Sequence, residues 1–166
     1  MLQNLDKVNW AELGAAQMPD LLQKIQSDQF AIQLDKERQN AWDELRELLY
    51  PEGIIDNWDW GGPGRMMQND LPHQTVPFLI EILNQTNSKS TQSGIIGLLW
   101  QLCTYSSVKL WVGEPGDPKY EAFVEWVKRL KDIIQQGLPY YQVLVNDPDP
   151  YLTKEVNDLL QKLSEE

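Results

Sequence analysis

VPFLIEIL, at residues 76–83, has a similar stretch on either side of it in the chain, MPDLLQKI at 18–25 and LPYYQVLV at 138–145. Each copy has an apolar residue, then a proline, then a short helical pattern. Proline suits the first turn of a helix, where its missing N–H has no partner within the helix. The three prolines lie 58 and 62 residues apart. A similar unit at a near-constant period is typical of a helical repeat array.

The net charge of the chain is −11, from 25 acidic and 14 basic side chains among 166 residues. This length allows one domain with a core of its own. Nucleic-acid binders need a basic surface, so the charge argues against nucleic acid and against an anionic membrane as partners. No stretch approaches the length that spans a bilayer, and the N-terminus has no signal-peptide core. We therefore expect a cytoplasmic protein.

Apolar spacing and helix-start signals predict an all-α fold in a single domain over 1–166. Trp10 begins a short helix after Asn9, and Leu71-Pro72 and Pro77 start the first helix of the second hairpin. Asp117-Pro118 and Asp149-Pro150 each combine an N-cap with a proline at the first helical position. We expect three helical hairpins at about 18–50, 72–105 and 138–164, an extra helix at about 118–136, and irregular loops at 51–71 and 106–117.

The segment from Ile95 to about Tyr105 is apolar nearly all round, and Ser90 or Thr91 can cap it. A helix without a polar face is buried, so this one is predicted to form the middle layer, covered from both sides. Gly94 and Gly97 each cost about 1 kcal/mol in a helix interior, which predicts close approach of another helix. A strand over 94–100 is the rival interpretation, but the cap, the length and the helical neighbours favour a helix.

The chain resembles a bacterial HEAT-repeat family over about residues 9–105. The resemblance is carried by Trp10, the Pro-x-Leu-Leu helix at 19–22, the Trp-x-x-Leu helix at 42–45 and the Val-Pro-Phe-Leu-Ile-Glu run at 76–81. It implies an armadillo-type right-handed superhelix of stacked antiparallel helix pairs, with no established catalytic residues and a role in protein–protein interaction. The long Gly/Trp loop and the extra helix at 118–136 depart from the family pattern.

No phosphate loop, nucleophile elbow, zinc-protease motif or cysteine pair occurs in the sequence. We therefore predict no catalytic residue, cofactor or metal. The one cysteine, Cys103, has apolar neighbours and is predicted to be a small buried hydrophobe. A metal site could in principle join His73 to Asp56, Asp59 and Asp70. Transition metals usually gather more nitrogen or sulfur ligands, and calcium loops have a stricter spacing, so a position near a helix start is the simpler explanation.

The loop at 51–71 is the most informative segment outside the repeats. It places Trp58, Trp60, Met66 and Met67 among glycines. Loops of this length are usually functional or disordered, and aromatic content argues against disorder. The tryptophans either cap the end of a hairpin or anchor a partner, since tryptophan is enriched in binding hot spots. We predict these four residues as partner-binding.

The function predicted from these features is a non-enzymatic protein–protein interaction module, acting as a scaffold, an inhibitor or an immunity-type binder. Its acidic surface suits a basic client. One alternative is a hydrolase or lyase with Asp56, Asp59 and Glu114 in the groove of the superhelix. Another is a helical-repeat nucleic-acid protein, which the charge disfavours. The sequence leaves the partner and the oligomeric state open.

Overall fold

The computed structural model describes residues 2–27, 35–49, 70–104 and 114–165, and these ranges contain helices and no strand. The prediction of an all-α fold is therefore confirmed. The elements are a 3-10 helix, η1 (Leu5–Lys7), and seven α-helices, namely α1 (Met18–Gln26), α2 (Asp35–Leu49), α4 (Leu71–Gln85), α5 (Lys89–Thr104), α6 (Pro118–Gln135), α7 (Leu138–Leu144) and α8 (Pro150–Ser164).

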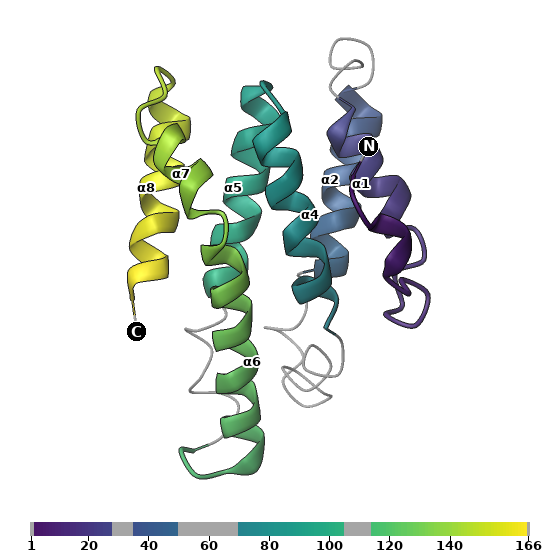
Figure 1. Ribbon diagram of the computed structural model, residues 1–166, viewed down its shortest axis with the longest axis vertical. Helices are drawn as coiled ribbons and strands as arrows, with labels where there is room; N and C mark the ends of the chain where they lie inside the picture. The colour runs from purple at the N-terminus through teal and green to yellow at the C-terminus, as the bar shows by residue number, and fades with distance from the viewer. Residues whose placement is uncertain (1, 28–34, 50–69, 105–113, 166) are drawn as a thin grey trace.

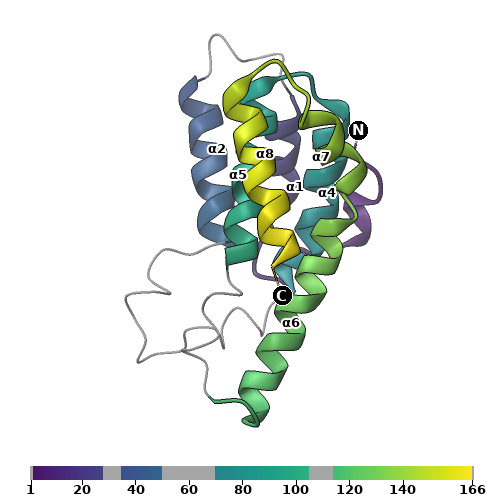
Figure 2. The ribbon, with the colours of Figure 1, turned by 90° about the vertical axis from the view of Figure 1, so that its left-hand side faces the viewer.

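The helices form two layers, which are seen edge-on in Figure 2. In one layer α2, α5 and α8 lie side by side and run in the same direction; in the other, α1, α4 and the α6–α7 pair run the opposite way (Figure 1). The central helix is α5, because it packs against α2, α4, α6 and α8. Its Ile95, Ile96 and Leu99 are fully buried between the layers, as the apolar pattern predicts.

The N-terminal segment packs on the core without the short helix predicted at Trp10. The residues from Trp10 to Gly14 form turns. The Trp10 indole is buried, contacts Phe78 with ring centroids 5.7 Å apart, and donates from Nε1 to the Leu5 carbonyl at 2.9 Å. These contacts bury the indole ring and satisfy its N–H. They determine the local conformation, and the capping signal of Asn9 does not.

Of the two signals predicted to start α4, Leu71-Pro72 is confirmed and Pro77 is wrong, because Pro77 lies inside the helix. The helix begins at Leu71, with Pro72 in its first turn, as Pro19 is in α1 and Pro139 in α7. Pro77 has no N–H for the carbonyl of His73, and it is tolerated on the exposed side of the helix. The matching prolines, at 19, 72 and 139, are therefore 53 and 67 residues apart, and the period is less regular than predicted.

The aspartate caps predicted at the starts of α6 and α8 are confirmed. The Asp117 carboxylate accepts from the Lys119 N–H at 2.8 Å, and Asp149 accepts from the N–H of Tyr151 at 2.9 Å. The start of α5 differs from the prediction, because the Ser88 hydroxyl accepts from the Thr91 N–H at 3.3 Å and the helix begins at Lys89. The segment 94–100 is helical, so the strand alternative is excluded.

Gln136 and Gly137 join α6 to α7. The Tyr141 hydroxyl donates to the Ile134 carbonyl at 2.9 Å, and the ring crosses Gly137 so closely that a Cβ there would lie 2.3 Å from the hydroxyl oxygen. Only glycine fits under this ring. The helix predicted as extra, at 118–136, therefore leads through a short junction into α7 within the same layer (Figure 1).

Candidate functional site: the outer face of α5

The partner-binding residues predicted from the sequence, Trp58, Trp60, Met66 and Met67, lie outside the described residues, as do Asp56 and Asp59. Their role in binding stays a prediction. Glu114 is described and is exposed in the turn before α6. The described residues offer a different surface, on α5, which the sequence does not predict.

The outer face of α5, which we define as Ser93, Gly97, Trp100, Gln101 and Thr104, is the solvent-facing stripe of the central helix. These positions recur at helical spacing and so share one side. Trp100 is 41% exposed, and the other four are partly exposed. The prediction that α5 forms a middle layer covered from both sides is therefore wrong, because this side of the helix faces solvent. Ser93, Gly97, Gln101 and Thr104 are small or polar, and they interrupt the apolar pattern of the helix in the sequence. Their helical spacing is the signal that could have identified this face.

The two glycines of α5 have different surroundings. A Cβ on Gly94 would come within 2.8 Å of the Trp42 ring on α2, which confirms the predicted close approach at this position. No described atom lies within 4 Å of the Cβ position of Gly97, so the same expectation is wrong there. Glycine costs about 1 kcal/mol relative to alanine in a helix interior. Packing within the described residues explains Gly94 and leaves Gly97 unexplained.

The chemistry of this face favours binding over catalysis. Its five residues include no ionisable side chain. Trp100 offers a flat apolar ring, and Gly97 leaves the helix backbone accessible. At its upper edge, the Ser93 hydroxyl donates to Glu155 on α8. Such a surface can seat an apolar side chain and the backbone of a partner.

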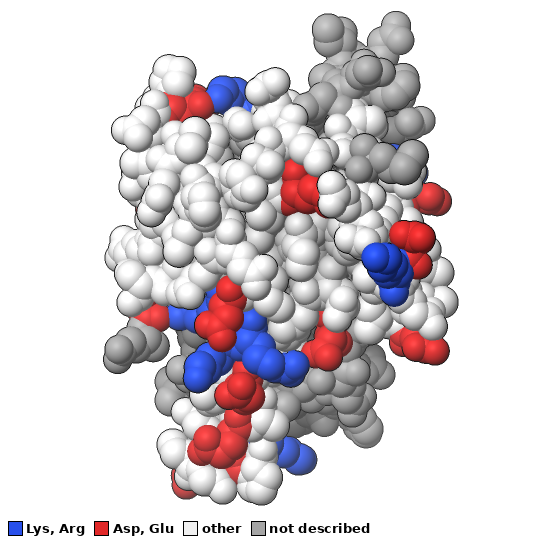
Figure 3. Space-filling model, in the orientation of Figure 1, with Lys and Arg blue, Asp and Glu red and all other residues white. Residues whose placement is uncertain are grey.

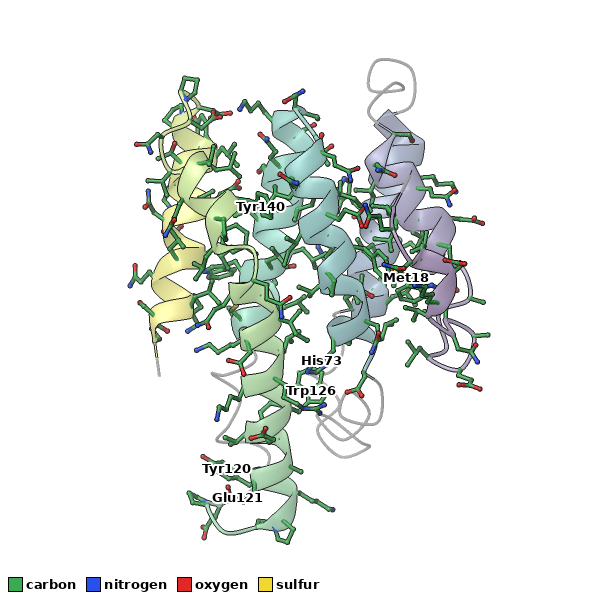
Figure 4. The ribbon with its side chains drawn as sticks, viewed as in Figure 1. Met18, His73, Tyr120, Glu121, Trp126 and Tyr140 are labelled. Atoms are coloured by element: carbon green, nitrogen blue, oxygen red, sulfur yellow. The ribbon has the colours of Figure 1, made fainter. Side chains whose placement is uncertain are left out.

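A second polar cluster lies where the start of α4 meets the middle of α6. His73 and Trp126 point toward each other there (Figure 4), with ring centroids 4.8 Å apart in an edge-to-face arrangement. The Nε2 atom of His73 lies 3.0 Å from the Trp126 carbonyl oxygen. Asp70 precedes the helix, and its Oδ1 atom lies 3.7 Å from both Nδ1 of His73 and Nη2 of Arg129. The expectation that His73 lies near a helix start is confirmed.

Burial keeps the remaining reactive groups of the core neutral. Cys103 is fully buried, and burial raises the pKa of its thiol to about 12. The thiolate is the nucleophilic form of cysteine, so this side chain is a buried hydrophobe, as predicted. The described residues contain no group of three or more His, Cys, Asp or Glu side chains that could hold a metal ion.

Charged side chains are unevenly distributed on the face shown in Figure 3. They gather over α6, where basic residues such as Lys128 and Arg129 alternate with acidic ones such as Glu125 and Asp132. The surface over α4 and α7 is largely uncharged and exposes Gln74, Pro77, Asn84, Gln85, Pro139, Gln142 and Val143. On this face, the basic side chains of the described residues are grouped over α6, with acidic side chains above and below them (Figure 3).

Comparisons with known proteins add no relative: no family model, no curated protein and no solved structure matches the chain. The resemblance to HEAT-repeat proteins therefore stays a prediction. None of the helices in the described ranges is long and apolar enough to cross a membrane.

Proposed function

We propose that the chain is a non-enzymatic protein–protein interaction module that holds a partner on the outer face of α5. In this proposal the pairs α1/α2, α4/α5 and α6–α7/α8 are HEAT-like repeats of a right-handed superhelix. Two parallel layers, with a central helix packed on both neighbours of its layer, support this arrangement. The observation that carries the binding proposal is Gly97 beside the exposed Trp100.

Gly97 is informative because it lowers helix stability and has no packing role among the described residues. A glycine that leaves open space over a helix allows another backbone to approach closely. Trp100 lies one turn further along the same face, and tryptophan is the residue type most enriched in binding hot spots. Together they provide a close-approach point and an anchor, which suits a helical segment of another protein.

The position of Trp100 relates this face to the loop predicted as partner-binding. Trp100 lies one turn before the end of α5 at Thr104. The end of α2 at Leu49 and the start of α4 at Leu71 lie at the same end of the layers (Figure 1). The 50–69 segment is joined to these two ends, so Trp58, Trp60, Met66 and Met67 remain proposed contacts. The net charge of −11 supports a basic partner.

Site-specific photo-crosslinking tests this proposal while the partner is still unidentified. A benzophenone amino acid replaces Gln101 on the outer face of α5, and Gln142 on α7 in a control, before exposure to extract of the native cell. We expect a specific adduct from position 101 alone, and expect Trp100→Ala to remove it while the protein stays folded. An adduct that survives Trp100→Ala, or that forms equally from position 142, contradicts the proposal.

A further inference from the structure

One oxygen atom of Asp70 is shared by two basic side chains. The Oδ1 atom lies 3.7 Å from Nδ1 of His73 and 3.7 Å from Nη2 of Arg129. Asp70 and Arg129 are half exposed, whereas the His73 side chain is only 6% exposed. Because Arg129 belongs to α6 and Asp70 precedes α4, the Asp70–Arg129 pair connects two helices that are distant in the sequence.

The hydrogen bond of His73 to the Trp126 carbonyl determines its tautomer. A carbonyl oxygen only accepts, so Nε2 of His73 carries the proton in this 3.0 Å contact. In the neutral ring, Nδ1 then presents a lone pair toward the Asp70 oxygen, and it cannot form a hydrogen bond with a carboxylate. When His73 is neutral, Arg129 is therefore the one of these two side chains whose charge attracts the Asp70 carboxylate.

We propose that Asp70, His73 and Arg129 form a proton-operated switch, in which a proton from solvent binds Nδ1 of His73 and draws the Asp70 carboxylate from Arg129 to His73. In the protonated state Nδ1 is a charged donor, and a charge-assisted hydrogen bond to a carboxylate is stronger than a half-exposed ion pair. Asp70 then binds within its own helix start. The ion pair that connects the start of α4 to α6 is lost. This inference is independent of the proposed function.

The charged and polar groups that face His73 decide the pH at which the exchange occurs. Burial lowers the pKa of His73 below its ordinary value of 6.5; the Trp126 carbonyl and then the Asp70 carboxylate raise it, and the Arg129 guanidinium lowers it. Because burial has the largest effect, His73 is neutral at pH 7 and binds a proton under mildly acidic conditions. Asp70 comes from the α4 side and Arg129 from α6.

Nuclear magnetic resonance of the intact protein tests the switch, because the chain has only one histidine. The Cε1–H signal of His73 reports its protonation, and the guanidinium signals of Arg129 report the loss of Asp70. We expect both to change with the same midpoint, below pH 6.5. Arg46, which pairs with Asp43 at 3.6 Å, is the matched control and should show no change at that midpoint.

Substitutions at the two half-exposed residues, Asp70 and Arg129, distinguish the switch from a titration of His73 that burial alone controls. Asp70→Asn should lower the midpoint of His73 and abolish the coupled change at Arg129, whereas Arg129→Gln should raise the midpoint. If the Arg129 signals stay constant while His73 titrates, or if Asp70→Asn leaves the midpoint unchanged, the proposal is overturned. Either result would mean that His73 titrates without exchanging the partner of Asp70.

Discussion

The indole ring of Trp42 on α2 lies against Gly94 on α5, so close that a Cβ at position 94 would come within 2.8 Å of it. Gly94→Ala should therefore lower the free energy of unfolding by about 1 kcal/mol. Overpacking of this kind costs about 1–3 kcal/mol, which exceeds the gain of about 1 kcal/mol in helix propensity. Urea unfolding measures the difference. The control is Gly94→Ala in a Trp42→Leu background, where alanine should be stabilising, and an equal effect in both backgrounds would show that this contact is absent.

The central position of α5 predicts different costs for two leucine truncations. Leu99 is fully buried between the layers, whereas Leu163 is 7% exposed and lies one residue before the end of α8. We expect Leu99→Ala to cost about 2–5 kcal/mol, the usual range for a core leucine, and Leu163→Ala to cost clearly less. Urea midpoints at unchanged m-value provide the measurement. Equal shifts for the two variants would contradict the central placement of α5.

His73 makes stability depend on pH in the mildly acidic range. Its pKa in the folded protein is lowered from 6.5, mainly by burial. The unfolded chain therefore binds the proton more readily, and stability that is fully present above about pH 6.5 is lost as the pH falls toward the folded pKa. Urea unfolding at about pH 7.5 and about pH 5.5 should show this loss, and Asp70→Asn should deepen it. His73→Gln is the control, and an equal pH effect in that variant would assign the loss to other groups.

The loop at 51–71 gives a prediction that separates its two interpretations. If the loop contacts the partner, Trp58→Ala and Trp60→Ala should weaken capture by about 2 kcal/mol or more with little change in melting temperature. If the tryptophans instead pack on their own domain, the same changes should lower stability and leave capture by the folded protein intact. Thermal unfolding, and binding to the partner that crosslinking identifies, are measured on the same samples. Normal capture by the folded double variant would exclude the loop as a contact.

Local signals predict much of the fold. Asp117-Pro118 and Asp149-Pro150 mark true helix starts because an aspartate cap acts on backbone groups two or three residues away. The prediction at Pro77 is wrong because a proline signals a helix start and also occurs on an exposed helix side, and the local pattern does not distinguish the two. The prediction at Trp10 is wrong because its indole partner, the Leu5 carbonyl, depends on the packing of the N-terminal segment on α4.

The candidate site is harder to predict because it depends on contacts between distant residues. Gly94 and Gly97 have the same appearance in the sequence, and only the position of Trp42 distinguishes them. Trp100 reads as one more apolar residue of a buried helix, whereas neither neighbouring helix covers its side of α5. Arg129 and Asp70 come from different elements, and no local sequence motif indicates that they form an ion pair.

Gly97→Ala is the variant that tests the proposed function most directly, because the proposal predicts opposite effects on stability and on binding. No described atom lies within 4 Å of the new Cβ, so the free energy of unfolding should rise by about 1 kcal/mol through helix propensity. The same methyl group would hold the partner away from α5. Two quantities are measured for the wild type and for Gly97→Ala. One is the dissociation constant for the partner that crosslinking identifies, and the other is the free energy of unfolding in urea. We predict a more stable protein that binds at least about tenfold more weakly, a loss of about 1.4 kcal/mol. A more stable protein with unchanged affinity would contradict the assignment of this face as the binding site.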